Sequence, residues 1–175
     1  MSNLTDLPRL NTPALLLDEV KMMRNIERLA DRARALKVTL RPHLKTAKSA
    51  DVARRLFADG PGPITVSTLA EAEEFFAAGY SDILYAVGIS PWKLARVAEL
   101  RGRGCDLKVI LDCAVQARAV ADAGIPALIE IDSDGHRGGL APGDPAITAI
   151  ARHLHANGAG MRGVMTHAGE SYGAS

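Results

Sequence analysis

The segment RPHLKTAK, from Arg41 to Lys48, holds the residues best suited to chemistry. Its alternating pattern predicts that Lys45 stands at the carboxyl end of a strand, on the same polar face as Arg41 and His43. Burial and neighbouring cations lower the pKa of an ammonium group, which suits an amine that attacks a carbonyl. From spacing alone the plainer interpretation also stands: Lys45 starts an exposed loop, and Lys48 is a solvated residue of a first helical turn.

Two further segments carry polar residues directly after predicted strands. The loop 132–140, DSDGHRGGL, has glycines that permit close backbone approach to a ligand, and its Arg137 could bind a carboxylate or phosphate. The loop lacks the spacing and terminal glutamate of an EF-hand, which argues against calcium, while a simple surface turn remains open. The segment THAGESY places His167 at a strand end, where it could face a ligand or be a satisfied core histidine.

A regular alternation of short apolar runs and helical patterns must position these segments. After an initial run over 13–18, the predicted strands are 38–45, 63–68, 82–87, 106–112, 126–132 and about 161–167. The predicted helices are 19–36, 49–60, 69–79, 91–104, 113–124 and 144–158. Thr68 and Glu71 form a capping-box pattern, and Asp144 followed by proline is typical of a helix start.

The strand faces distinguish two α/β architectures. Strands of an open parallel sheet are apolar on both faces, whereas several strands here carry polar residues on one face only. Thr65, Ser67, Lys108, Asp112, Glu130 and Asp132 are those residues. This pattern favours a partial (β/α)8 TIM-type barrel, with an open doubly wound sheet as the alternative. Because a complete barrel has eight strands and about 250 residues, six barrel strands predict an incomplete barrel.

Bulk properties exclude several classes of protein. The net charge of +1 over 175 residues gives no electrostatic case for binding nucleic acid or an anionic membrane. The sequence shows no apolar run of membrane-spanning length and no signal-peptide pattern. Cys105 and Cys113 lack zinc-site spacing and are expected to be ordinary reduced thiols of a cytoplasmic protein.

Four segments in the same order resemble a known family. RPHLKTAK, VSTLAEAEEFFAAGYSDILYAVGI, EIDSDGHRGG and THAGESYG are similar to segments of the fold-type III pyridoxal-phosphate enzymes, specifically the D-serine dehydratase and D-threonine aldolase group. The resemblance runs from about Thr12 to Gly173. It implies an alanine-racemase-like N-terminal barrel over residues 19–175, and a segment 1–18 whose strand pairs with a β domain outside this chain.

The resemblance also implies a cofactor and a set of site residues. Lys45 would hold pyridoxal phosphate as a Schiff base, and His43, Arg137, His167 and Tyr172 would lie near cofactor or substrate. A divalent metal, zinc or manganese, is implied as well, with its ligands outside this chain, so no metal ligand is assigned. Two residues depart from the family pattern: Ala47 replaces a histidine of the lysine motif, and Glu170 replaces a histidine of the last segment.

The implied function is that of a pyridoxal-phosphate-dependent lyase acting on small D-β-hydroxy amino acids, by dehydration of D-serine or aldol cleavage of D-threonine. Freed Lys45 would be the α-proton base of the dehydratase route. The family also implies a homodimer in the full-length form. An amino-acid racemase, a non-catalytic pyridoxal-phosphate carrier and a truncated chain that does not fold competently are the alternatives.

Overall fold

The computed structural model describes residues 9–173, with the side chain of residue 172 excepted. The chain divides into two compact units at the Leu40–Arg41 boundary. Each unit is described by itself. The predicted site residues 43, 45, 137, 167 and 172 all belong to the second unit.

The first unit consists of an irregular segment followed by helix α1 (Glu19–Ala35). Asp18 caps this helix by accepting a hydrogen bond from the Lys21 N–H at 3.0 Å. Residues 14–18 form no strand, and the side chains of Leu15, Leu16 and Leu17 are exposed. A strand exists only when another strand pairs with it, and none does so within residues 9–173. Pairing of the 1–18 segment with a separate β domain therefore stays a prediction.

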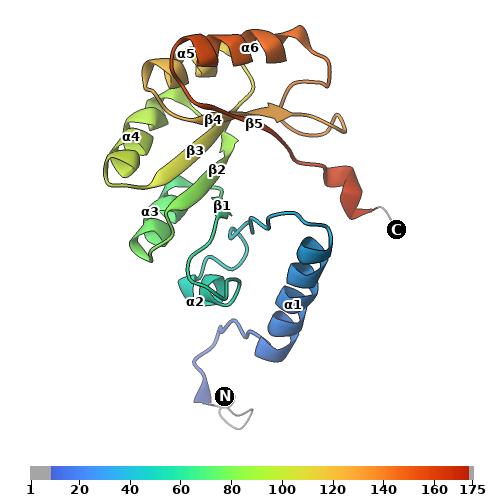
Figure 1. Cartoon of the computed structure of the whole chain (residues 1–175). Helices are drawn as coiled ribbons and strands as arrows, with labels where there is room; N and C mark the ends of the chain where they lie inside the picture. The colour runs from blue at the N-terminus through green and yellow to red at the C-terminus, as the bar shows by residue number, and fades with distance from the viewer. Residues whose placement is uncertain (1–8, 174–175) are drawn as a thin grey trace. The chain divides into compact units, whose positions relative to one another are not determined.

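The second unit is built on one parallel sheet (Figure 1). Its strands are β1 (Ile64–Val66), β2 (Asp82–Gly88), β3 (Asp106–Leu111), β4 (Ala127–Ile131) and β5 (Met161–Thr166). Helices α2 (Ala50–Arg54), α3 (Leu69–Ala77), α4 (Leu94–Gly102), α5 (Ala114–Asp122) and α6 (Pro145–Ala156) lie between or before them, with short 3-10 helices η2 (Pro91–Lys93) and η3 (Gly169–Tyr172).

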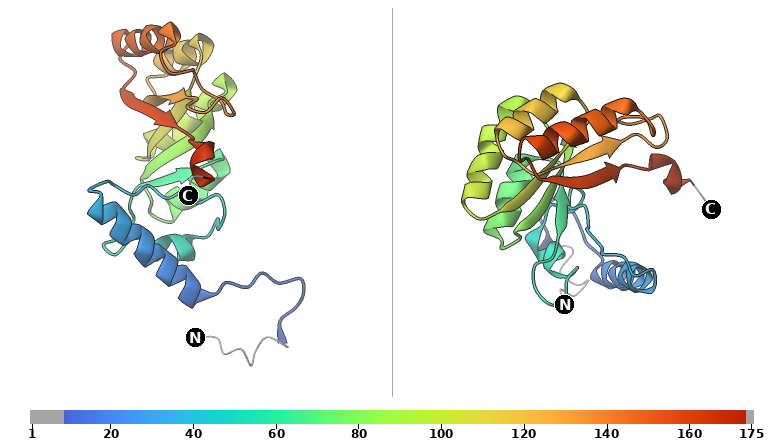
Figure 2. Two further views of the ribbon diagram at one scale, coloured as in Figure 1. Left: turned by 90° about the vertical axis from the view of Figure 1, so that its right-hand side faces the viewer. Right: turned by 45° about the horizontal axis from the view of Figure 1, so that its top comes forward.

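The strand order distinguishes the two predicted architectures. The strands pair in sequence order, β1-β2-β3-β4-β5, and every pair is parallel. A doubly wound sheet reverses its direction of winding and covers both faces with helices. Here the strands follow one another in a constant direction, and helices α3 to α6 lie on one face of the sheet, as Figure 2 shows. The barrel prediction is confirmed for these five strands, and the open doubly wound sheet is wrong.

The predicted strand over 38–45 is largely absent. It forms only an isolated parallel bridge between His43 and Thr65, made by Thr65 N–H to Pro42 O at 2.8 Å and Leu44 N–H to Thr65 O at 2.9 Å. Pro42 has no N–H with which to extend this ladder, and a turn begins at Leu44. The sheet therefore has five strands and one bridged segment, where six strands were expected.

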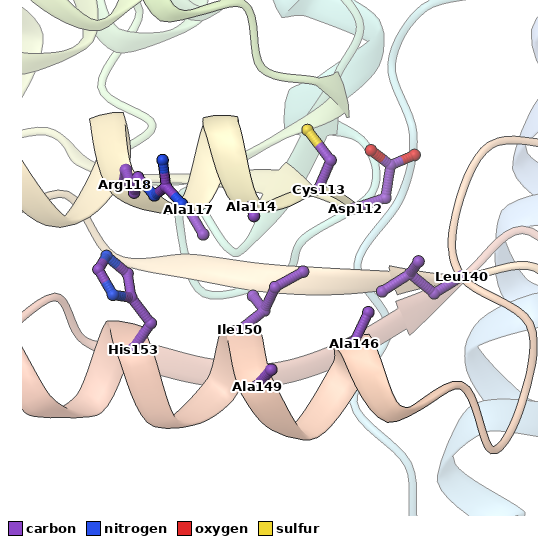
Figure 3. A pocket seen from close by; sticks show the side chains of 10 residues that line it. All are labelled: Asp112, Cys113, Ala114, Ala117, Arg118, Leu140, Ala146, Ala149, Ile150 and His153. Carbon is purple, nitrogen blue, oxygen red and sulfur yellow. The ribbon is translucent and has the colours of Figure 1, made fainter.

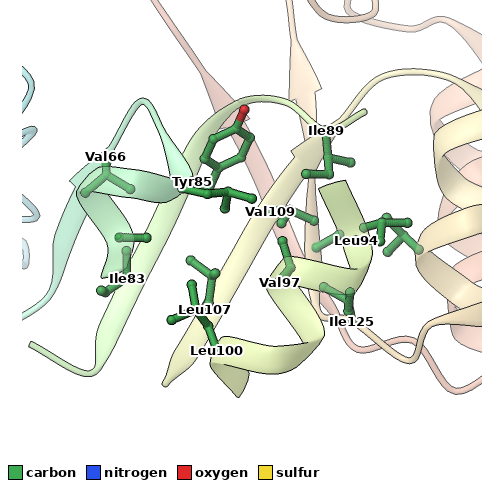
Figure 4. Packing of buried hydrophobic residues seen from close by; sticks show 14 of the residues in the cluster. Val66, Ile83, Tyr85, Ile89, Leu94, Val97, Leu100, Leu107, Val109 and Ile125 are labelled. Atoms are coloured by element: carbon green, nitrogen blue, oxygen red, sulfur yellow. The ribbon is translucent and has the colours of Figure 1, made fainter. Parts of the chain in front are cut away.

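The two faces of the sheet differ as the alternation predicts. The helix-covered face is apolar, and its residues form the core with the helices (Figure 4). Members of this core include Val66, Ile83, Tyr85, Leu107, Val109, Leu111 and Ile129. The opposite face carries the polar residues of the strands, which are thus available for a site.

Candidate active site

The carboxyl ends of the strands meet at one edge of the sheet because all strands are parallel. His43 and Lys45 reach this edge from the bridged segment, and Ser67, Asp132 and His167 follow β1, β4 and β5. The structure therefore brings most of the predicted site residues to the same edge of one unit.

His43 is the best-defined side chain of this edge. It is half-buried, its Nδ1 accepts a hydrogen bond from the Lys45 N–H at 3.3 Å, and its Nε2 lies 3.3 Å from Ser67 Oγ. Since a backbone N–H can only donate, Nδ1 is the acceptor and the proton of the neutral ring is on Nε2. Burial, then the charges of Lys45 and His167, lower the pKa of His43 and outweigh the opposing effect of Glu71. The imidazole is therefore neutral at pH 7.

Lys45 is exposed and lies in the turn 44–47, as the plainer interpretation of the sequence predicts. The sheet does not close into a full circle, so the side chains at its strand ends are open to solvent. Within residues 9–173 the Lys45 ammonium forms no ion pair with a carboxylate. Lys45 and His167 each lie close enough to His43 for their charges to lower its pKa. The Lys45 amine is therefore accessible and has no ion-pair partner among the described residues.

Lys48 is exposed as predicted, but it is more than a solvated residue. Its Nζ lies 3.1 Å from Glu71 Oε1, an ion pair by distance that lacks the angles of a hydrogen bond. Glu71 is buried, and its Oε2 accepts a hydrogen bond from the Ser67 N–H at 2.8 Å. Burial raises the pKa of Glu71, but the hydrogen bond from Ser67 and the charge of Lys48 outweigh it and lower the pKa overall.

Arg137 and His167 come from the loops that follow β4 and β5. These loops are joined by the hydrogen bond from the Glu170 N–H to Asp134 Oδ2 at 2.9 Å. A Cβ on Gly169 would lie 3.7 Å from Arg137 Nε, so the exposed guanidinium rests beside the segment that His167 begins. The side chain of Tyr172 lies outside the described part of the chain, and its role stays a prediction.

Gly139 explains why the Arg137 loop requires glycine. Its φ is +118°, and a Cβ there would lie 2.7 Å from the backbone nitrogen of Asp132. The Gly139 N–H donates to Asp112 Oδ2 at 3.0 Å, which fastens the loop to the end of β3. The predicted close backbone approach is thus made to the protein's own chain.

Arg41, which the sequence grouped with His43 and Lys45, does not join them at the carboxyl edge. Arg41 Nη2 donates to Asp82 Oδ2 at 2.9 Å, and its Nη1 contacts the main-chain oxygens of Ile64 and Asp82. Asp82 and Ile64 begin their strands, so this guanidinium lies at the amino edge of the sheet. Lys108 joins the same amino-edge group through Asp82 at 2.8 Å. Alternation predicts which face a residue occupies but not which end of the strand its long side chain reaches.

The sequence patterns did not assign three residues near the carboxyl edge, Glu71, Ser67 and Glu130, to the site. Glu71 and Ser67 support His43 and Lys48, and Glu130 carries a pKa that burial, Asp112 and Asp132 all raise. The capping-box pattern pointed to Glu71, although only as a helix cap. Among residues 9–173 no cluster of His, Cys, Asp or Glu has a metal-binding arrangement.

A groove of about 360 Å³ lies elsewhere, between α5 and α6 on the helical side (Figure 3). Its lining is mainly alanines and Ile150, with Cys113 at one part and His153 at another. None of the predicted site residues lines it. In the described part of the chain, none of the helices has the length and apolar character needed to cross a bilayer.

Comparison with known proteins identifies the family. The family model for the alanine racemase N-terminal domain matches residues 17–174. The chain belongs to the alanine racemase N-terminal domain family. D-threo-3-hydroxyaspartate dehydratase from Delftia sp. (strain HT23) is 51% identical over 170 residues, which cover 93% of this chain and 45% of that enzyme. D-threonine aldolase from Arthrobacter sp. is 33% identical over 153 residues, covering 83% of this chain and 40% of the aldolase.

Solved structures agree with this family assignment. The Delftia dehydratase superposes with a TM-score of 0.90 at 50% identity, over 94% of this chain and 45% of that one. D-threonine aldolase from Filomicrobium marinum superposes with a TM-score of 0.80 at 32% identity, over 90% of this chain and 44% of that one. The chain spans about half the length of the curated relatives it matches.

Proposed function

We propose that this chain is the cofactor-holding part of a pyridoxal-phosphate-dependent lyase that acts on small D-β-hydroxy amino acids. One observation carries the proposal: Lys45 is an accessible amine at the carboxyl edge of the sheet, free of a carboxylate partner among the described residues, beside a neutral His43. The relatives named for dehydration or aldol cleavage of such amino acids support the substrate class.

The residues present fit this cofactor. Pyridoxal phosphate is an anionic aldehyde, and the edge offers an amine at Lys45, a neutral imidazole at His43 and an exposed guanidinium at Arg137. The Lys45 amine would condense with the aldehyde and release one water molecule. When bound, the cofactor supplies an electron sink that stabilises negative charge at the substrate Cα.

The chain's own residues have the following proposed roles. Lys45 Nζ binds the aldehyde and afterwards takes the α-proton of the substrate. His43 stays neutral, so it adds no positive charge beside that amine and leaves it free to accept a proton. Arg137 binds an anionic group, a carboxylate or phosphate, and His167 lines the same edge as Lys45. Tyr172 is proposed near the substrate on the resemblance alone.

A divalent metal and a second subunit belong to the proposal for the complete protein. A Delftia dehydratase variant has been solved in a metal-free form, which supports a metal in that relative. A metal on the substrate hydroxyl would act as a Lewis acid, with ligands outside this chain. We further propose a homodimer in the cytoplasm.

The test is to mix the chain with pyridoxal phosphate, record the absorbance spectrum, reduce with borohydride and map the labelled peptide. Label concentrated on Lys45 supports the proposal. Equal label on Lys48, Lys37 and other exposed lysines would contradict it. Lys45→Arg, which keeps the charge but cannot form the bond, is the matched control.

Product analysis with D-amino acids then separates the chemistries. Dehydration releases a keto acid and ammonia, aldol cleavage releases an aldehyde, and a racemase would give only the other enantiomer. Label on Lys45 without any of these products in a form spanning the full length of the relatives would indicate a carrier and contradict the lyase proposal.

A further inference from the structure

A buried carboxylate is linked to the residues on both sides of the predicted reactive lysine, directly to Lys48 and through Ser67 to His43. Glu71, in the first turn of α3, is 8% exposed. One carboxylate oxygen accepts the Ser67 N–H at 2.8 Å, and the other lies 3.1 Å from Lys48 Nζ. Ser67 is the partner of His43, and Lys48 follows Lys45 by three positions. Glu71 is therefore connected to the chain before Lys45 and to the chain after it.

The turn that carries Lys45 is fastened at its base. Leu44 is buried, its N–H donates to Thr65 O at 2.9 Å, and its carbonyl accepts the Lys48 N–H at 2.9 Å. The Lys48 backbone has a φ of +46°, a left-handed conformation that a lysine rarely adopts without support. The ion pair with Glu71 supplies support at that residue.

Helix capping does not account for the whole arrangement. In an ordinary capping box the third residue of the helix accepts the N–H of the N-cap residue, which here is Thr68. Thr68 Oγ1 does accept the Glu71 N–H at 3.0 Å, but the Glu71 carboxylate reaches back one residue further, to Ser67. Its second oxygen faces Lys48, which belongs to another element. The carboxylate thus links α3 to the lysine turn.

We propose that Glu71 is a positioning residue: through Lys48 and Ser67 it holds the 44–48 turn and His43 in the arrangement that presents Lys45 to an aldehyde. This inference rests on the proposed function of Lys45. An amine held in place reacts faster and binds more tightly than one on a mobile turn, because its freedom is already restricted before the ligand arrives. Glu71 itself touches no reacting atom.

The substitution Glu71→Gln tests the charge without removing the cap. The glutamine oxygen can still accept the Ser67 N–H, whereas its amide no longer attracts Lys48. Glu73→Gln is the matched control, since Glu73 lies on the same helix and pairs with Arg96 away from the turn. The readout is borohydride-fixed label on Lys45 as a function of pyridoxal phosphate concentration. We expect the apparent affinity to fall about tenfold for Glu71→Gln and less than about twofold for Glu73→Gln.

Lys48 variants separate positioning from folding, because its side chain is exposed and tolerates change. Lys48→Met should reproduce the loss, Lys48→Arg should restore most of the affinity, and the double variant Glu71→Gln/Lys48→Met should be no worse than either single one. Thermal unfolding of each variant shows that the fold is retained.

The outcomes are distinguishable. A wild-type chain without label on Lys45 defeats the proposed function. Labelled wild type with Glu71→Gln or Lys48→Met within about twofold of it overturns the positioning role and leaves the proposed function standing. A Glu71→Gln chain that fails to fold leaves the decision to Lys48→Met.

Discussion

The two edges of the sheet differ in how their charged side chains are paired. At the amino edge, Asp82 pairs with Arg41 at 2.9 Å and with Lys108 at 2.8 Å, and Lys108 also pairs with Asp106 at 2.6 Å. The side chain of Lys108 is only 15% exposed, and its ammonium pairs with two carboxylates. Burial raises the pKa of Asp82, but the two cations outweigh it and lower the pKa overall.

At the carboxyl edge, Lys48 and Glu71 form an ion pair, but two other charged residues of the described chain, Lys45 and Glu130, have no opposite charge beside them. The Lys45 ammonium has no carboxylate partner among residues 9–173, and Glu130 stands near two other carboxylates, which raise its pKa together with burial. Charged groups without an opposite charge lower the stability of a fold, and such groups are concentrated at functional sites. In barrel enzymes generally the amino edge contributes stability and the carboxyl edge carries the site, and the contrast between these two edges agrees with the proposed function.

The largest expected effect is the loss of cofactor labelling in Lys45→Ala. Label on the 41–48 segment should fall to background, because Lys48 is paired with Glu71 and does not replace Lys45. The free energy of unfolding should change by less than about 0.5 kcal/mol, since Lys45 is exposed and unpaired. Peptide mapping and urea unfolding measure the two quantities. A large loss of stability would show that this edge is structural too.

The converse substitution is Asp82→Ala at the amino edge. It leaves Lys108 with one carboxylate and Arg41 with none of its present charge partners, so the free energy of unfolding should fall by about 2 kcal/mol. Labelling of Lys45 in the folded protein should be unchanged. Asp122→Ala, at an exposed aspartate of α5, is the control and should have little effect. If Asp82→Ala and Asp122→Ala lowered the free energy of unfolding equally, the ion pairs of the amino edge would have no special role in stability.

A smaller effect with a defined pH dependence is expected for Glu130→Gln. Because the pKa of Glu130 is raised on folding, its contribution to stability is present below its ordinary pKa and is lost as the pH rises through the raised value. The variant should therefore be more stable than wild type at neutral pH, by less than about 1 kcal/mol, and no more stable at acidic pH. Urea unfolding at both pH values checks this. Stabilisation at acidic pH instead would reverse the assigned sign.

The smallest effect should come from Glu170→Gln. Glu170 lies 3.6 Å from His136 Nδ1, and both side chains are about 70% exposed, so the pair contributes little. We expect a change below about 0.5 kcal/mol in the free energy of unfolding, measured by urea titration. The loop is held instead by the Glu170 N–H, which the substitution retains. A change several times larger would mean that this departure from the family pattern has a structural role.

Local patterns in the sequence predicted most of the fold. Alternation found all five strands, and Thr68 and Asp144 were correctly predicted to begin helices, since each side chain caps its helix. The prediction of a strand over 38–45 was wrong because Pro42 has no N–H to donate to the ladder, so only the bridge at His43 forms. A hydrophobic pattern does not show such a missing donor.

The sequence predicted which residues lie at this edge, but it did not predict which side chains contact one another there. Lys45, His43 and His167 lie at the same edge, which follows from the parallel topology. The link from Glu71 to Lys48 spans 23 residues and depends on how α3 packs beside the turn, so no local pattern specifies it. The same limit led to the wrong placement of Arg41, whose long side chain reaches the opposite edge.

The hydrogen bond from the main chain of Lys45 to His43 has a consequence for spectroscopy. It assigns the two ring nitrogens of one imidazole to different chemical states, protonated and lone-pair bearing. Isotope-labelled His43 would therefore register any displacement of the neighbouring backbone as a change in its nitrogen resonances, which gives this polypeptide an internal reporter for occupancy at its strand ends.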